Sequence, residues 1–190
     1  MSKSRMEAFS DGVLAIIITI MVLEMKVPHG DQLADLRGLW PVFLSYVLSF
    51  MYVGIYWNNH HHLLQAVHRI DGKILLANLH LLFWLTLVPF TTGWMGENHF
   101  AALPTAIYGL DLLAAAIAYF ILSHGLLKRH GQDSALAKAL GSDFKGKISV
   151  VVYLIAIPLA FVHTAISCGL YLAIAVLWFF PDKRIERALG

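Results

Sequence analysis

The sequence has few charged side chains, a single cysteine and almost no excess of positive charge. Charged residues make up 14% of the 190 positions and hydrophobic residues 58%, whereas a soluble domain is usually about a quarter charged. This deficit excludes a disordered chain and argues against a soluble enzyme domain. The net charge of +2 is too small to cover nucleic-acid phosphates, so no nucleic-acid partner is expected.

The scarcity of cysteine limits the possible metal sites. Cys168 stands alone, which excludes an intrachain disulfide and a cysteine-based zinc site. His60, His61 and His62 are adjacent, and adjacent residues on a helix point about 100° apart, so these imidazoles cannot ligate one ion together. We therefore expect no metal ion, no other cofactor and no enzymatic activity.

Long apolar runs without charge are what the sequence does contain. A helix needs about 20 residues to cross a hydrocarbon core of about 30 Å. The run from Ile148 to Phe180 is too long for one crossing, and His163 and Thr164 near its middle favour a break. The sequence thus predicts an all-α integral membrane protein with six transmembrane helices, over about Ala8–Leu23, Leu39–Trp57, Ile74–Trp94, Ala101–Leu122, Ile148–Val162 and Ala165–Phe180.

The charges between these predicted spans indicate an orientation. If the N-terminus is cytoplasmic, 12 Lys and Arg residues fall in cytoplasmic segments and 2 in outer loops. Such a bias is typical of inner-membrane proteins. It predicts a multi-pass protein of the cell inner membrane with both termini in the cytoplasm. No flexible linker or repeat divides the chain, so residues 1–190 are expected to form one domain.

The first predicted helix has two different faces. Asp11 points about 140° away from Ile16, at 100° per residue. From the pattern alone, contact with lipid or with another helix is the simpler interpretation of the apolar face. That face carries a single hydroxyl and comprises residues spaced three or four apart: Gly12, Ile16, Thr19, Ile20 and Leu23.

Polar groups at the inner boundary of the membrane need partners inside the protein, because an unpaired charge there is costly. Arg5 and Asp11 lie at this boundary on the first helix, and the histidine cluster follows the second span on the same side. We expect the Asp11 carboxylate to accept a hydrogen bond from the imidazole of His60 or His61.

Four motifs on the first three predicted helices carry a resemblance to a known family. They are Arg5-x-x-x-Phe9-Ser10-Asp11-Gly12, Leu23-Glu24-Met25-Lys26-Val27-Pro28, Tyr56-Trp57-x-Asn59-His60-His61-x-Leu63, and Pro89-Phe90. In this order they resemble the transmembrane protein 175 family, the lysosomal potassium channels and their bacterial relatives. The length is similar to that of the bacterial form, which has one six-helix unit.

The resemblance implies a homotetrameric, potassium-preferring cation channel in the lipid bilayer, with a pore lined by the first helix. A constriction at Ile16, Ile20 and Leu23 would stand in place of a Thr-Val-Gly-Tyr-Gly filter, and Thr19 would supply a polar layer that influences selectivity. The polar network that holds the first helix in this family would comprise Arg5, Ser10, Asp11, Trp57, Asn59, His60 and His61.

A second class of function stays open on the residues themselves. Asp111 lies near the middle of the fourth predicted span, and an ionisable side chain inside a membrane is a functional candidate. A secondary carrier or a proton pathway would use Asp111 and the histidines as relay groups. The structural alternative is that Asp111 is protonated, or bonded to a Thr or Tyr of a neighbouring helix.

Overall fold

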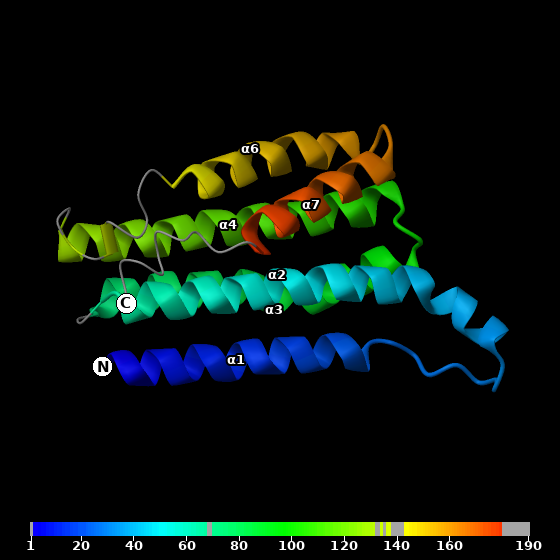
Figure 1. Ribbon diagram of the computed structural model, residues 1–190, viewed down its shortest axis with the longest axis horizontal. Helices are drawn as coiled ribbons and strands as arrows, with labels where there is room; N and C mark the ends of the chain where they lie inside the picture. The colour runs from blue at the N-terminus through cyan, green and yellow to red at the C-terminus, as the bar shows by residue number, and fades with distance from the viewer. Residues whose placement is uncertain (1, 68–69, 132–133, 135, 138–142, 180–190) are drawn as a thin grey trace.

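The chain folds into helices that lie side by side (Figure 1), as seen in a computed structural model that describes residues 2–67, 70–131, 134, 136–137 and 143–179. The prediction of an all-α protein with six helices is confirmed. The four long helices α1 to α4 are each apolar and long enough to cross a membrane. The elements are α1 (Lys3–Leu23), the 3-10 helix η1 (Leu33–Leu39), α2 (Trp40–Gln65), α3 (Gly72–Glu97), α4 (Ala102–His130), α6 (Phe144–Leu159) and α7 (Thr164–Phe179).

The helices extend past the apolar runs that predicted them. α2 continues to Gln65 instead of ending at Trp57, and α4 continues to His130 instead of ending at Leu122. Hydropathy indicates where a span leaves the hydrocarbon, whereas a helix ends where its backbone hydrogen-bond pattern ends. The polar segment from Tyr56 to His62 is therefore helical, and its side chains face several directions.

The last apolar run is divided as the sequence predicts. α6 and α7 have 16 residues each, and a short turn ending at His163 separates them. The Ser167 hydroxyl donates to the Ala156 carbonyl at 2.7 Å and ties the two helices together. At 1.5 Å per residue each is about 24 Å long, shorter than the other four helices. The last residue predicted for this run, Phe180, lies outside the described residues.

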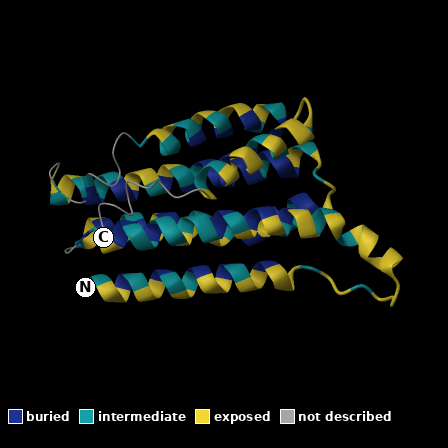
Figure 2. Ribbon diagram, in the orientation of Figure 1, coloured by how far each residue is buried: buried dark blue, intermediate teal, exposed yellow. Residues whose placement is uncertain are grey.

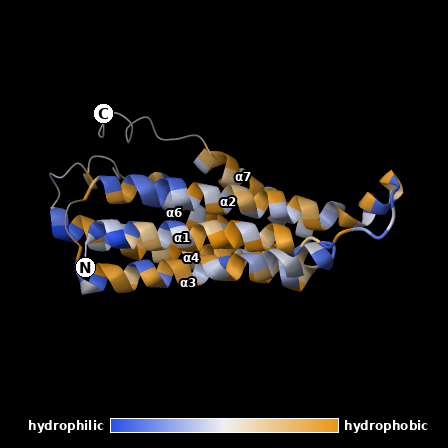
Figure 3. Ribbon diagram, turned by 90° about the horizontal axis from the view of Figure 1, so that it is seen from below, coloured by the Kyte–Doolittle hydropathy of each residue, from blue (hydrophilic) through white to orange (hydrophobic). Residues whose placement is uncertain are grey.

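The arrangement leaves α1 at one edge of the bundle and α6 at the opposite edge (Figure 1). α1 packs against α3 and α2, and α4 separates α3 from α6. Apolar residues run along the helices, and hydrophilic residues gather at the end where the N-terminus lies (Figure 3). One long surface of α1 consequently has no neighbour among the residues that the structure describes.

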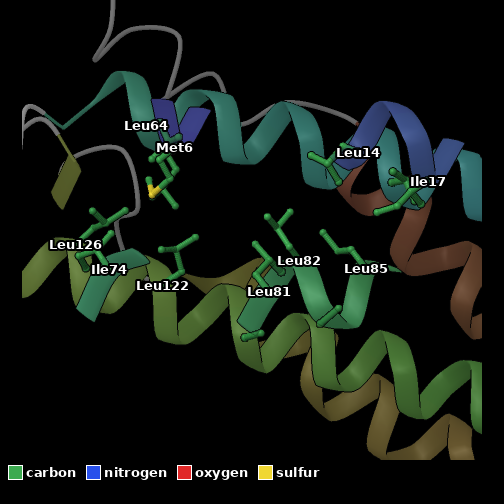
Figure 4. Close-up of a cluster of buried hydrophobic side chains, with 14 of the residues drawn as sticks. Met6, Leu14, Ile17, Leu64, Ile74, Leu81, Leu82, Leu85, Leu122 and Leu126 are labelled. Carbon is green, nitrogen blue, oxygen red and sulfur yellow. The ribbon is translucent and has the colours of Figure 1, made fainter. Parts of the chain in front are cut away.

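Leucine-rich packing joins α1, α3 and α4. In the larger core cluster Leu14 and Ile17 of α1 lie opposite Leu82 and Leu85 of α3, and Met6 lies toward the other end, on the side of Leu122 and Leu126 of α4 (Figure 4). Lipid is as apolar as these side chains, so close packing and interhelical hydrogen bonds must hold the helices together. The buried Ser49 hydroxyl makes such bonds to Thr92 at 2.6 Å and to Tyr108 at 3.0 Å, which links α2, α3 and α4.

Asp71 fixes the start of α3 and attaches it to α4. Its carboxylate accepts from the Ile74 backbone N–H at 3.0 Å and from the Arg129 guanidinium at 2.7 Å. The Ile74 N–H, followed by the charge of Arg129, lowers the pKa of the Asp71 carboxyl below its ordinary value. These contacts set the depth of α3 beside α4, and through α3 that of α1.

Candidate pore helix and its polar anchor

The apolar stripe of α1 is not packed inside the chain. The side of α1 that the chain buries is formed by Met6, Ser10, Leu14, Ile17 and Met21. In contrast, Ile16 is 58% exposed, Ile20 40% and Leu23 79%, and Figure 2 shows this exposed edge along α1. The three residues predicted from the resemblance to form a constriction thus share one open surface.

Thr19 lies in this stripe between Ile16 and Ile20, and it is exposed. Its hydroxyl donates to backbone carbonyls of its own helix, at 2.9 Å to Ile16 and 3.1 Å to Ala15. Because the proton is used by the backbone, the side chain offers oxygen lone pairs to whatever lies in front of the stripe. An oxygen acceptor of this kind suits a cation.

A buried hydrogen-bond chain anchors the inner half of α1. The Ser10 hydroxyl donates to the Met6 carbonyl at 2.8 Å and accepts from the Asn78 amide at 3.0 Å. The Asn78 oxygen meets the His60 Nε2 at 2.7 Å. Since Ser10, Asn78 and His60 are almost completely buried, the chain joins α1, α3 and α2 away from solvent.

Asp11 has a different partner from the one expected. The Trp57 indole N–H donates to Asp11 Oδ1 at 3.0 Å, whereas His60 is bonded to Asn78. The expected bond between Asp11 and a histidine was therefore wrong. An indole reaches further than an imidazole, so Trp57, one turn before His61, spans the gap between α2 and α1.

His61 contacts a second acidic residue of α1. Its Nδ1 lies 3.5 Å from the Glu7 carboxylate, and its ring stacks on Trp57 with centroids 5.9 Å apart. Neighbouring histidines thus serve different contacts, as their helical positions predict. The described residues contain no group of three or more His, Cys, Asp or Glu side chains placed to hold a metal ion.

Two other residues assigned to the polar network lie apart from it. The Asn59 amide donates to the Ile55 carbonyl of its own helix, and the Asn59 carbonyl accepts from Tyr119 of α4 at 3.3 Å. Asn59 therefore contributes to packing between α2 and α4. Arg5 is exposed, and no ion pair among the described residues includes it.

An open groove runs beside the stripe between α1 and α3. Its volume is about 650 Å³. Gly93 has no side chain, and a Cβ added there would meet nothing within 4 Å, so the α3 wall stays open at this point. On α1 the groove is lined by Val13, Ile16, Ile17, Ile20 and Glu24, and on α3 by Thr86, Pro89, Phe90, Gly93, Trp94 and Glu97.

Comparisons with known proteins identify the family. Residues 5–89 match the family described as endosomal/lysosomal potassium channel TMEM175. The chain is 54% identical to a potassium channel of Chryseobacterium sp. (strain P1-3), with 100% of this chain and 98% of that protein covered. It is 33% identical to a potassium channel of Streptomyces collinus, with coverage of 96% and 94%. The chain belongs to the TMEM175 family.

The solved structure of a TMEM175 relative extends the likeness to every helix. The crystal structure of a lysosomal potassium-selective channel TMEM175 homolog from Chamaesiphon minutus has a TM-score of 0.81 and 31% identity, and covers 99% of this chain and 98% of that one. The sequence motifs supported the TMEM175 resemblance only on the first three helices. Membership in a channel family agrees with the expectation that the chain is not an enzyme.

Asn78 is the residue that sequence reasoning missed. It bonds both to Ser10 and to His60 and is 1% exposed. The available signal was a lone amide in the apolar third span, where a polar side chain requires a partner on another helix. In this TMEM175 protein the anchor of α1 is therefore centred on α3 as much as on α2.

Asp111 lies inside the bundle and not on the open side of α1. It is 4% exposed, and its Oδ2 lies 3.0 Å from the Thr91 hydroxyl of α3. A threonine partner on a neighbouring helix is one of the alternatives expected from the sequence. We predict that Asp111→Asn, which keeps the shape and one hydrogen bond, leaves the unitary conductance within about twofold of wild type.

Single-channel recording of the purified Asp111→Asn variant checks this prediction. Thr91→Val, which removes the partner hydroxyl but keeps the side-chain shape, is the matched control for loss of the pair. A conductance that falls tenfold in a folded Asp111→Asn protein would instead make Asp111 a relay group on the transport path.

Proposed function

We propose that this protein is a potassium-preferring cation channel in which four copies of a single six-helix unit, residues 1–190, surround a pore lined by α1. The observation that carries the proposal is the stripe of Ile16, Thr19, Ile20 and Leu23, which is exposed although the opposite face of α1 is buried. The names of the bacterial relatives, which are potassium channels, support the choice of ion.

The stripe explains how such a pore would close. Four Ile16 side chains around one axis form a narrow apolar ring that water does not wet, and a hydrated ion cannot cross a dry constriction. Ile20 and Leu23 add further rings at i+4 and i+7, toward the end of α1. These rings would be the constriction in place of a Thr-Val-Gly-Tyr-Gly filter.

Thr19 would supply the polar layer between these rings. Its oxygen lone pairs face the stripe because its proton is bonded to the backbone. Four such oxygens replace part of the hydration shell of a passing cation. Potassium, which holds its water less tightly than sodium, loses less on entering this layer, and so the preference for potassium follows.

The polar anchor would set the resting angle of α1. Rotation or tilting of α1 moves Ile16 off the axis and opens the ring. The buried Ser10–Asn78–His60 chain and the Asp11–Trp57 bond both hold α1 near its inner end. Movement is thus easiest in the half beyond them, where the constriction residues lie.

The proposed orientation follows from the distribution of positive charge. Both termini would be cytoplasmic in the cell inner membrane, with α6 and α7 as the fifth and sixth spans. The inner end would then carry Arg5 and the anchor, and the outer end would carry Leu23 and Glu24. This orientation rests on the bias of Lys and Arg between the loops.

Recording from the purified protein in planar bilayers tests the function. We expect unitary current steps, and a reversal potential that shifts toward the potassium equilibrium when sodium replaces potassium on one side. Protein-free vesicles taken through the same reconstitution are the control. A carrier or proton pathway through Asp111 and the histidines gives ion flux without unitary steps, and that result would refute the channel.

A further inference from the structure

We propose that adjacent copies lie side by side and meet through two different surfaces, with Val22 of one copy seated in the α1–α3 groove of the next. The inference rests on the proposed tetramer with α1 at its axis, and it specifies which two surfaces make the contact.

Two different surfaces flank the stripe of α1. At 100° per residue, Val13, Ile20 and Ile17 lie on one side of Ile16, at about 40° to 100°. This is the side of the groove, which these residues line together with α3. On the other side, at about 80° to 140°, is the α2-side flank, which comprises Ala8, Asp11, Ala15 and Val22.

A closed ring makes these two surfaces meet. If every copy turns its stripe toward one axis, the surface to one side of the stripe must face the opposite side of the next copy. Such a contact joins two different patches, and each copy both offers one and receives one. The α2-side flank and the groove are the patches that lie in these positions.

Depth in the membrane selects the residue that enters the groove. In a ring with rotational symmetry about the membrane normal, a given residue lies at the same depth in every copy. The groove reaches from Val13 to Glu24 along α1, in the half of the helix that ends at Leu23. On the α2-side flank at this depth, Val22 is the large exposed apolar side chain, with 43% of its surface open.

The groove is shaped to receive a side chain of this kind. Pro89, Phe90 and Trp94 supply apolar walls, and Gly93 leaves open space between them. Small residues allow helices in membranes to approach closely, and Ala8 and Ala15 of the flank are small and exposed. An isopropyl group from the next copy would fill the space opposite Gly93 while the two α1 helices stay close.

Arg5 and Asp11, two charged residues at the inner end of α1, do not meet in this arrangement. Arg5 lies about 20° from Ile16 on the helical wheel, so it continues the stripe and has no acidic partner among the described residues. Asp11, on the α2-side flank, uses one carboxylate oxygen for Trp57. Arg5 precedes Asp11 by six residues, about 9 Å along the helix, so in a symmetric ring these two charges lie at different depths and the contact rests on Val22 and the groove.

Disulfide cross-linking in membranes tests the contact. In a Cys168→Ser background, the pair Val22→Cys and Gly93→Cys in one chain is oxidised and analysed on denaturing gels. We expect a ladder of dimers, trimers and tetramers, because each chain then links to two neighbours. Either single-cysteine variant can form at most dimers, since one thiol joins only two chains.

A matched control separates a specific contact from collision. Leu154→Cys replaces Val22→Cys in the pair, since Leu154 is similarly exposed but belongs to α6 at the far edge of the bundle. A second pair, Ala15→Cys with Thr86→Cys, probes the same contact if Gly93→Cys fails to fold, because Ala15 and Thr86 lie seven positions before Val22 and Gly93 respectively, and Thr86 also lines the groove. Monomers from both folded pairs, as expected if lipid fills the groove, would overturn the proposal, as would a ladder from the control pair.

The assay is independent of ion flow. Suppose that Val22→Cys with Gly93→Cys gives a ladder, but Ile16→Asn leaves the current unchanged. The proposed interface would then stand, and the proposed pore lined by α1 would be refuted. Unitary currents in a protein whose two pairs never cross-link would retain the channel and refute the interface.

Discussion

Ile16→Asn is expected to raise the current at least tenfold and to weaken the discrimination between potassium and sodium. An amide at this position gives water a hydrogen-bonding partner in the narrowest ring, so the constriction wets. A tenfold rise corresponds to a barrier lowered by about 1.4 kcal/mol. Bilayer recordings of open probability, unitary conductance and reversal potential measure the change.

The control for this prediction must be an isoleucine that is equally open but distant from α1. Ile155 of α6 is 50% exposed, against 58% for Ile16, and lies at the opposite edge of the bundle. Ile155→Asn makes the same chemical change and should leave the current unaltered. Equal effects at positions 16 and 155, or no effect at 16 in a folded protein, would exclude α1 as the pore wall.

Ile17 illustrates why the structure is needed to choose that control. From the helical wheel it points about 100° from Ile16, which suggests a silent site. In the fold it is only 3% exposed and packs in the core cluster with Leu82 and Leu85. Ile17→Asn would bury an amide without a partner at a cost of about 1–3 kcal/mol, so its effect on stability would be mixed with any effect on the pore.

Asn78→Ala is expected to destabilise the protein by about 3 kcal/mol or more and to lower the yield of the proposed tetramer severely. The change removes the partner of His60 and one partner of Ser10, both buried, and each stranded polar group costs about 1–3 kcal/mol. Thermal unfolding and size-exclusion profiles of the purified protein measure this loss.

Asp11→Ala should cost less, about 1 kcal/mol, because the Asp11–Trp57 bond is partly open and the freed indole can reach water. Asn98→Ala, at the exposed end of the same helix α3, is the matched control for Asn78→Ala. An Asn78→Ala protein as stable as Asn98→Ala would show that the buried chain does not anchor α1.

The fold class and the number of helices follow from the sequence. Charged side chains are energetically unfavourable in hydrocarbon, so runs without charge locate the long helices. The run over 148–180 divides into two helices at its polar centre. Helical spacing also groups Ile16, Ile20 and Leu23 on one face of α1, but the pattern alone left open whether that face packs on another helix. The four motifs were sufficient to indicate the family.

Only the tertiary structure decided which polar groups meet. Spacing along α2 places Trp57, Asn59, His60 and His61 near the inner boundary but gives no rotation of α2 relative to α1 and α3. That rotation directs Trp57 to Asp11, His60 to Asn78 and Asn59 toward α4. Likewise, the groove beside the stripe exists because α3 lies next to α1, a relation between helices that no local pattern encodes.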